Sequence, residues 1–367
     1  MSSHDLKAQG RGRDGGGNGV QNPGAENPGD GGAVAAAAAA PAIPVARRRH
    51  AGFVHRFALE IRMLAVLVVL SIALSLISSH FFSLGNLFNL MDQSVVVGIA
   101  AIGQTFVILV AGIDLSVGAL TGVAGIVLGL ALTSAGLPVP VAIAAAIVFG
   151  GLMGLVNGLL VTFGRIAPFI VTLGMMSVAR SLAYVISDGN SISSLPQGLS
   201  YIGSADVFGI PANFLFVVLL FALAWYYLTF TKGGRTIYAI GSNIEAARAS
   251  GLKVTYYTTL AYVLSGALSA LAAVMLASRL LSIDPIAGNG LELDSIAAVV
   301  IGGASLFGGR GSMIGTFFGV LIMGLIRNGL NLLNVGPYWQ GSAIGAIIII
   351  AVLAERIVTT RINRRGQ

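Results

Sequence analysis

Three long apolar runs limit what this chain can fold into more than any other feature of its sequence. They are MLAVLVVLSIALSLIS at 63–78, FLFVVLLFALAWYYL at 214–228 and AIGAIIIIAVLA at 343–354. Each lies in a window close to the ~20 residues that an α-helix needs to cross the hydrocarbon of a bilayer. The whole chain shares this character, since 56% of its residues are hydrophobic, 10% are charged and its mean hydropathy is +0.88. The sequence therefore predicts an all-α polytopic membrane protein.

The apolar pattern predicts about ten transmembrane helices, several of them interrupted by glycine. Their expected positions are 62–79, 92–111, 114–135, 139–162, 168–187, 212–231, 256–277, 293–308, 312–331 and 338–355. Many of the 50 glycines are spaced by four, which leaves one helix face open to close approach by another helix. These sets are Gly118/Gly122, Gly125/Gly129, Gly150/Gly154/Gly158, Gly315/Gly319 and Gly341/Gly345. The spacing fits tight packing, and it also fits helices that slide during gating.

The two ends of the chain differ from the rest. The segment GGGNGVQNPGAENPGDGGAVAAAAAAPAIP is rich in Gly, Ala and Pro, and it cannot bury enough apolar area to offset the entropy lost on ordering. We expect a disordered tail at 1–50, a transmembrane domain at 51–357 with a polar loop at 232–255, and a basic tail at 358–367. The first apolar run comes late, after RRRH, and no cleavage site follows it, so a signal peptide is not expected.

The charged residues predict how the spans are oriented. If the N-terminus is inside, most bases fall in inner segments: Arg47, Arg48, Arg49, Arg56, Arg165, Lys232, Arg235, Arg248, Lys253, Arg310, Arg356, Arg361, Arg364 and Arg365. The outer loops have Arg279 as their only clear base, beside the acids Asp188, Asp206, Asp284 and Glu292. This asymmetry follows the positive-inside rule, so both termini are expected on the cytoplasmic side. It also accounts for the net charge of +7 without nucleic acid as a partner.

Several kinds of catalytic chemistry have no counterpart in the sequence. There is no cysteine, hence no thiolate nucleophile or thiolate metal site. No G-x-x-x-x-G-K-[ST] motif is present, so we expect no nucleotide hydrolysis by this chain. No H-E-x-x-H motif is present either, and the four histidines lie in the tail or beside the first span. The sequence predicts a transport protein rather than an enzyme, with no cofactor.

Polar residues inside apolar segments are the candidates for a transport pathway. Asp114 in AGIDLSVG can cap the following helix, or it can belong to a gate or path. Arg180 and Arg327 are expected to extend their charged ends toward the outer surface. The neutral residues can line a path for a hydroxylated solute, or they can bond between helices. The candidates for a path or gate are Gln104, Asp114, Ser116, Asn157, Asn328 and Asn331. No chain of carboxylates crosses the membrane, which argues against an ion-driven mechanism.

One polar stretch, GSNIEAARASGL at 241–252, has the signals of a short capped helix. Ser242 and Glu245 form S-x-x-E, which predicts a capping box at the N-terminal end. Gly251 followed by Leu252 predicts a Schellman motif at the C-terminal end. So short a helix is unstable alone in water, so it must dock on something. It is either a connector on the membrane surface or a docking element.

The same stretch resembles a known family. GGRTIYAIGSNIEAARASGLKV is similar to the cytoplasmic coupling loop of the permease subunits of bacterial ABC importers for ribose and related monosaccharides. NLFNLMDQSVVVGIAAIGQTFVILVAGIDLSVGAL and GLELDSIAAVVIGGASLFGGRGSMIGTFFGVLIMGLIRNGLNLL resemble that family too. The resemblance covers about residues 60 to 355, and the combination of AGIDLSVG with ELDSIAAVVIGG is specific. The long N-terminal tail and some of the outer loops depart from it.

The resemblance implies a homodimer in the bacterial inner membrane, with an ABC ATPase subunit on the cytoplasmic face and a periplasmic sugar-binding protein outside. It implies an ATPase-coupling helix made of Ser242, Asn243, Glu245, Ala246, Ala247, Arg248 and Gly251. The sugar stays open among ribose, xylose, galactose, inositol and other polyols. The alternative is a stand-alone secondary carrier or facilitator for a small polar solute, which would need ionisable relays within the membrane.

Overall fold

The computed structural model describes residues 58–207, 209–336, 339–346, 349–350 and 353. Its helices are α2 (Ala58–Ile77), α3 (Leu84–Leu109), α4 (Val117–Thr133), α5 (Val139–Thr162), α6 (Pro168–Ile186), α7 (Gln197–Ser204), α8 (Ala212–Phe230), α9 (Lys232–Ser242), α10 (Ile244–Ala249), α11 (Val254–Leu280), α12 (Leu291–Ile301) and α13 (Met313–Leu332). Two short antiparallel strands, β1 (Asp206–Val207) and β2 (Ile210–Pro211), lie between α7 and α8. The expected tails at 1–50 and 358–367 lie outside the described residues.

The all-α membrane fold predicted from the sequence is confirmed. Among the described residues, seven helices are long and apolar enough to cross a membrane, namely α2, α3, α5, α6, α8, α11 and α13. α5 has the predicted bounds, while α4 and α12 are shorter than the spans expected there, at 17 and 11 residues. The tenth predicted span, 338–355, is only partly described, and residues 339–346 are helical.

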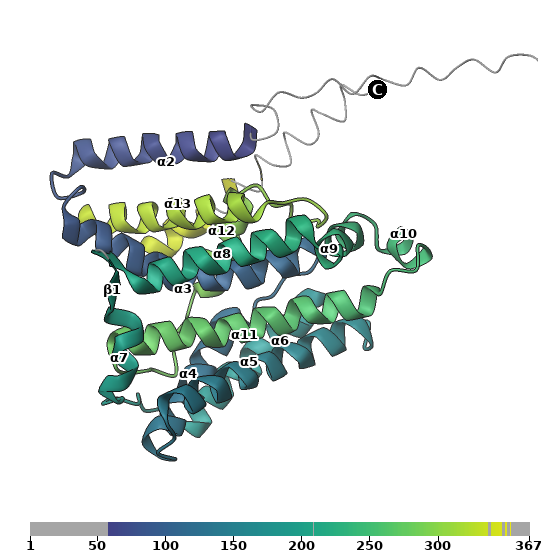
Figure 1. Ribbon diagram of the computed structural model, residues 1–367, viewed down its shortest axis with the longest axis horizontal. Helices are drawn as coiled ribbons and strands as arrows, with labels where there is room; N and C mark the ends of the chain where they lie inside the picture. The colour runs from purple at the N-terminus through teal and green to yellow at the C-terminus, as the bar shows by residue number, and fades with distance from the viewer. Residues whose placement is uncertain (1–57, 208, 337–338, 347–348, 351–352, 354–367) are drawn as a thin grey trace, which may run out of the picture. The chain divides into compact units, whose positions relative to one another are not determined.

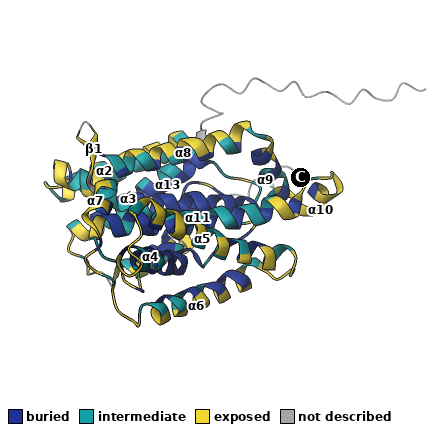
Figure 2. Ribbon diagram, turned by 60° about the horizontal axis from the view of Figure 1, so that its bottom comes forward, coloured by how far each residue is buried: buried dark blue, intermediate teal, exposed yellow. Residues whose placement is uncertain are grey.

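Helices α3, α4 and α11 form the core (Figures 1 and 2). In the apolar window of α3, 83% of the residues are buried, against 61% in α11 and 0% in α2. The side chains of α2 are as apolar as those of α3, so their exposure means that α2 faces lipid or another protein rather than the core. α2 therefore lies at the periphery, and α3 and α11 position the other helices.

Four of the five glycine sets lie against a closely packed neighbour, as predicted, and for two of these sets the neighbour is a helix. A methyl group at Gly150, Gly154 or Gly158 of α5 would overlap the backbone of α11. The same holds for Gly315 and Gly319 of α13 against α12. In contrast, nothing described lies within 4 Å of a Cβ placed at Gly341 or Gly345, so the packing predicted there is wrong for the described part of this chain. Sliding of helices along these faces stays a prediction.

A loop after α11 packs against the glycine face of α4. Side chains at Gly118, Gly122 and Gly125 would overlap residues 283–288 of this loop. Non-helical backbone is tolerated at membrane depth only where protein covers it, and the missing side chains of α4 make that cover possible. Other parts of the expected spans are also non-helical, namely 114–116 and 134–135 beside α4 and 302–308 after α12.

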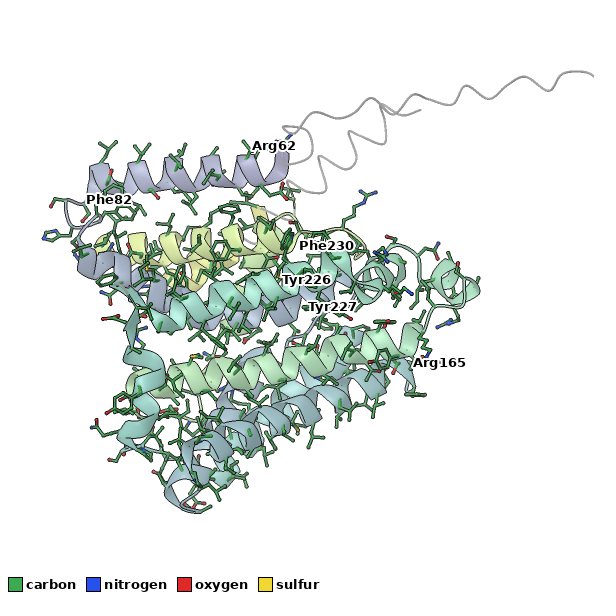
Figure 3. All side chains as sticks on the ribbon, in the orientation of Figure 1. Arg62, Phe82, Arg165, Tyr226, Tyr227 and Phe230 are labelled. Atoms are coloured by element: carbon green, nitrogen blue, oxygen red, sulfur yellow. The ribbon has the colours of Figure 1, made fainter. Side chains whose placement is uncertain are left out.

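Basic and acidic loop residues separate to opposite ends of the helix bundle. Figure 3 shows Arg62 of α2 and Arg165 of the loop after α5 toward the end of the bundle where α9 and α10 lie. We call this the α10 end, and the opposite end, where α7 and β1 lie, the α7 end (Figure 1). Among the acids of the α7 end, Asp206 is in β1, while Asp188 and Asp284 lie in the loops after α6 and α11, which pair through Ile192 and Ile283.

Candidate functional site

The polar stretch predicted to be one helix is divided between α9 and α10. Ser242 is the last residue of α9, and its hydroxyl donates to the Tyr238 carbonyl at 2.8 Å. Asn243 is extended (φ −162°, ψ 106°), and its side-chain oxygen accepts a hydrogen bond from the Ala246 N–H at 2.9 Å. Asn243 is therefore the N-cap of α10.

The capping box predicted for Ser242 and Glu245 is wrong. Ser242 belongs to α9 and its hydroxyl bonds back to the Tyr238 carbonyl, so it does not accept the Glu245 N–H, and the N-cap of α10 is Asn243. Glu245 instead forms an exposed ion pair with Arg248 at 3.2 Å. Ser and Asn are both favoured N-caps, so the sequence alone did not separate the two positions.

The C-terminal end of α10 has the predicted Schellman motif. Gly251 has a positive φ of 75°, which glycine adopts without strain. Its N–H donates to the Arg248 carbonyl at 3.0 Å, and the Leu252 N–H donates to the Ala247 carbonyl at 3.1 Å. These two bonds define the motif. α10 thus has defined caps at both ends.

One side chain of α10 faces the rest of the protein. Ala247 is 4% exposed and belongs to the main hydrophobic core, whereas Asn243, Glu245, Ala246 and Arg248 are exposed. A helix of six residues has too few internal hydrogen bonds to be stable alone. Its caps and the buried Ala247 side chain hold it in place, with its remaining surface open to a partner.

Helix α9 is tied to elements far away in the sequence. The Gly309 N–H donates to the Leu109 carbonyl at 3.0 Å, and a methyl group at Gly241 would overlap both of these groups. The Tyr238 hydroxyl donates to the Gly311 carbonyl at 3.0 Å. Burial raises the pKa of Tyr238, so this phenol stays neutral and able to donate. A displacement of α9 therefore acts on the end of α3 and on the 302–312 loop as well as on α8 and α11.

A buried polar cluster joins three helices in the interior. One oxygen of Asp114 accepts from the Ser116 N–H at 2.9 Å and from the Ser116 hydroxyl at 2.5 Å. The other oxygen accepts from the Ser265 hydroxyl of α11 at 2.7 Å. Asn157 of α5 donates to the Ser116 hydroxyl at 3.0 Å. All four residues are at most 1% exposed.

This cluster changes the role predicted for Asp114. The N-cap of α4 is Ser116, not Asp114, although Asp114 does accept its backbone N–H. Both carboxylate oxygens are bonded, one of them across to α11, so Asp114 connects the start of α4 to a neighbouring helix. The structure thus brings Asp114, Ser116 and Asn157 together, and for Asn157 it shows bonding between helices.

No hydrogen bond in the described part of the chain joins the other predicted path residues to this cluster. Asn328 of α13 and Asn86 of α3 exchange two hydrogen bonds, at 3.0 and 2.7 Å, which is again bonding between helices. Asn331 is exposed and accepts from Gln340 at 2.8 Å. Gln104 is fully buried on α3, and neither of its amide atoms has a partner among the described residues. Among the described residues, Gln104 thus has both side-chain polar atoms unpaired, whereas Asn157 has only its Oδ1 unpaired.

Both intramembrane arginines bind partners within the protein, although the Arg327 side chain is 34% exposed. Arg327 forms an ion pair with Asp294 of α12, which is buried. Arg180 donates to the Pro285 and Ala287 carbonyls at 2.9 and 3.2 Å, which fastens the loop that packs on α4. Buried carbonyls and a carboxylate satisfy these guanidinium groups more directly than distant water. Sequence reasoning missed Asp294, although an acid inside an apolar segment was a usable signal.

A polar cavity opens beside α10. It has a volume of about 850 Å³ and lies where the ends of α3, α5, α9 and α11 approach one another. The hydroxyls of Thr258 and Tyr262 are buried at its wall, and neither has a partner among the described residues. None of the path residues predicted from the sequence lines it. Thr258 and Tyr262 lie in a span that begins with several Tyr and Thr residues, so which of these hydroxyls face a cavity was visible only in the structure.

Comparison with known proteins decides the family. Residues 86–352 match the family model described as branched-chain amino acid transport system / permease component. The chain belongs to this permease family. The ribose import permease protein of Bacillus subtilis is 46% identical to the permease over 292 residues, which cover 79% of this chain and 90% of that protein. The ribose import permease protein of Haemophilus influenzae is 41% identical over 310 residues, 83% of this chain and 96% of that protein.

A relative that is named for another sugar matches over a similar share of the chain. The D-allose transport system permease protein of Escherichia coli is 36% identical over 292 residues, 80% of this chain and 90% of that protein. No solved structure matches the permease. The permease is therefore a multi-pass inner-membrane transport subunit and not an enzyme, and the family resemblance found in its sequence is confirmed.

Proposed function

We propose that the permease is the membrane subunit of an ATP-driven importer for a monosaccharide of the ribose type. A periplasmic binding protein delivers the sugar, and a separate ABC ATPase subunit hydrolyses ATP. Support comes from relatives named as ribose and D-allose permeases, which match over at least 90% of their own length. The missing P-loop motif fits a division of labour in which another chain binds ATP.

The exposed, doubly capped helix α10 is the observation that most supports this function. Asn243, Glu245, Ala246 and Arg248 form a surface that a partner can contact, while Ala247 fixes the helix to the core. A rigid helix transmits a displacement that a flexible loop would absorb. We infer that α10 docks on the ATPase and that α9 passes the movement to α3 through the close approach of Gly241 to the backbone of Leu109 and Gly309.

The charge distribution supports a cytoplasmic location for the α10 end. Bases concentrate there and acids at the α7 end, which is the asymmetry of the positive-inside rule. Loop 188–210, with Asp188 and Asp206, then faces the binding protein. A second copy of the permease completes the importer, and both termini are placed in the cytoplasm.

We propose that the buried cluster holds the start of α4 in place in the inward-facing or outward-facing state of the importer. This cluster consists of Asp114, Ser116, Asn157 and Ser265. Its bonds cross between α4, α5 and α11, and α11 is one of the elements on which α9 acts. The polar cavity beside α10 is proposed as the cytoplasmic exit for the sugar, because its unpaired Thr258 and Tyr262 hydroxyls can bond to a polyol.

Uptake by reconstituted vesicles tests this function. The permease, its ATPase and its binding protein are incorporated together, and uptake of labelled ribose, allose and fructose is measured with and without ATP. We expect uptake of at least one sugar that needs all three components. Uptake by the permease alone, driven by a proton or sodium gradient, would instead establish the secondary-carrier alternative.

A further inference from the structure

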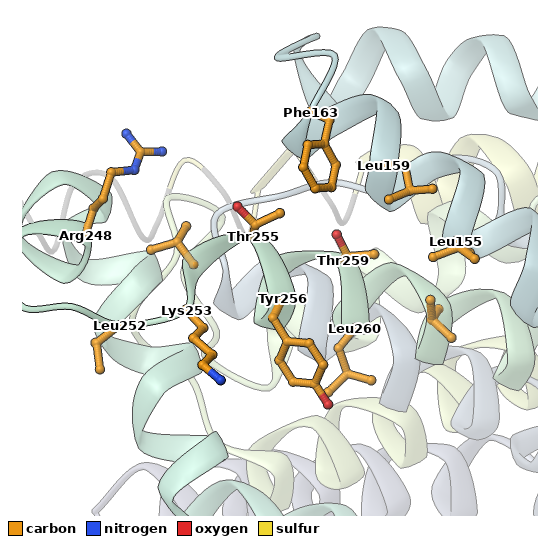
Figure 4. A pocket seen from close by; sticks show the side chains of 12 residues that line it. Leu155, Leu159, Phe163, Arg248, Leu252, Lys253, Thr255, Tyr256, Thr259 and Leu260 are labelled. Carbon is orange, nitrogen blue, oxygen red and sulfur yellow. The ribbon is translucent and has the colours of Figure 1, made fainter.

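A groove with apolar walls lies along the permease where α5 ends and α11 begins (Figure 4). Its volume is about 690 Å³. Leu155, Leu159 and Phe163 line it from α5 and its C-cap, and Leu260 and Val263 line it from α11. Leu159 and Phe163 are 40% and 71% exposed, so nothing in the described chain covers this wall.

Two basic residues lie at the α10 end of the groove. Figure 4 shows Arg248 and Lys253 at one end, with Leu155 and Leu159 at the other. Arg248 has Glu245 as its ion-pair partner, but both side chains are mostly exposed, at 63% and 77%. Such exposed pairs contribute ~0–1 kcal/mol, so this carboxylate holds Arg248 weakly. Lys253 has no ion-pair partner in the described part of the chain, so both cations can bind an added anion.

The apolar wall of the groove and the basic residues at its end together fit an amphiphile with an anionic head. A free sugar would leave its hydroxyls unpaired against the leucine wall, whereas an acyl chain would bury apolar surface there. From Leu155 to Phe163 the helix rises about 12 Å, close to the ~15 Å of hydrocarbon in one leaflet. The cations lie just beyond this apolar wall, where α5 ends and α11 begins. That is the depth at which a phospholipid has its phosphate.

We propose that this groove binds one anionic phospholipid from the leaflet on the α10 side. The phosphate lies between Arg248 and Lys253, and an acyl chain follows the wall formed by Leu155, Leu159 and Val263. Basic residues at the membrane surface attract anionic lipids in this way. Because Arg248 is part of α10, the bound lipid supports the helix that we propose docks on the ATPase. Anionic lipid then becomes a regulator of the importer.

Native mass spectrometry of the purified permease tests lipid binding without ATPase or sugar, so its outcome is independent of the proposed function. The permease is mixed with equal amounts of phosphatidylglycerol and phosphatidylcholine that have the same acyl chains. We expect preferential retention of phosphatidylglycerol. Lys253→Gln should weaken this retention about five-fold, which corresponds to ~1 kcal/mol for one basic residue near an anionic surface.

Two further variants separate this site from general surface charge. Lys232→Gln removes an exposed base at the same end that does not line the groove, and it should leave retention unchanged. Leu159→Trp fills the groove, and it should lower retention of phosphatidylglycerol while Lys232→Gln does not. Equal retention of the two lipids, no retention of either, or equal effects of Lys253→Gln and Lys232→Gln would overturn the proposal.

Discussion

Proline at position 247 is expected to separate membrane insertion from transport. Ala247 is the fourth residue of α10, and its N–H donates to the Asn243 carbonyl at 3.0 Å. Proline removes this hydrogen bond, and its ring crowds the Asn243 carbonyl, at a cost of ~3 kcal/mol or more in a helix interior. The Asn243 cap contributes ~1 kcal/mol, so it cannot offset this loss. Ala247→Pro should therefore unfold α10 and leave the membrane helices intact.

The assay compares sugar uptake with ATPase activity in vesicles that hold the permease, its ATPase and its binding protein. We expect Ala247→Pro to insert normally and to lose both uptake and the stimulation of the ATPase by loaded binding protein. Ile244→Pro is the matched control, because proline is tolerated at the first helical position, where no intrahelical N–H bond is lost. The extended Asn243 also suits a residue that precedes proline. An Ala247→Pro variant with normal uptake and normal stimulation would refute the coupling role of α10.

Four other perturbations test separate parts of the account. Gly241→Ala should place a methyl group against the backbone of α3 and of the 302–312 loop, lowering stability by ~1–3 kcal/mol as overpacking does, which thermal unfolding in detergent would detect. Asp114→Ala should leave three donors of the buried cluster without their acceptor, at ~1–3 kcal/mol for an unsatisfied group, again measured by thermal unfolding. Reversing the charges of Asp188 and Asp206 should weaken binding of the loaded binding protein more than assembly with the ATPase, and equal losses in pull-down assays would contradict this. Deletion of residues 1–45 should leave insertion and uptake near normal, whereas loss of insertion would show that the tail has a role.

Much of the fold follows from local sequence because membrane helices leave strong local signals. α5 begins and ends where its apolar run predicts, and the glycines of α5 predict the close approach of another helix. The identity of that helix, α11, is not encoded in the spacing. The loop that packs on α4 was missed for the same reason, since Gly118 and Gly122 show that a neighbour comes close but not that it is a loop.

The site was predictable only where its bonds are local. The Schellman motif at Gly251 joins residues at most five positions apart, and the sequence predicts it correctly. The pairing of Arg327 with Asp294 and the bond from Ser265 to Asp114 join distant segments, so they needed the structure. Ser242 and Asn243 are adjacent and have similar preferences for the N-cap position. The chain uses Asn243 as the N-cap of α10, while Ser242 packs against Gly309.

Cysteine labelling tests the central claim, that α10 is the surface on which the ATPase docks. The chain has no cysteine, so a single Ala246→Cys change gives one exposed thiol on α10. Asp206→Cys gives a matched exposed thiol at the α7 end. The rate of maleimide labelling is measured with and without the purified ATPase subunit. We predict that the ATPase slows labelling at position 246 and leaves position 206 unchanged. Equal labelling at position 246 in the presence and absence of the ATPase would contradict the account.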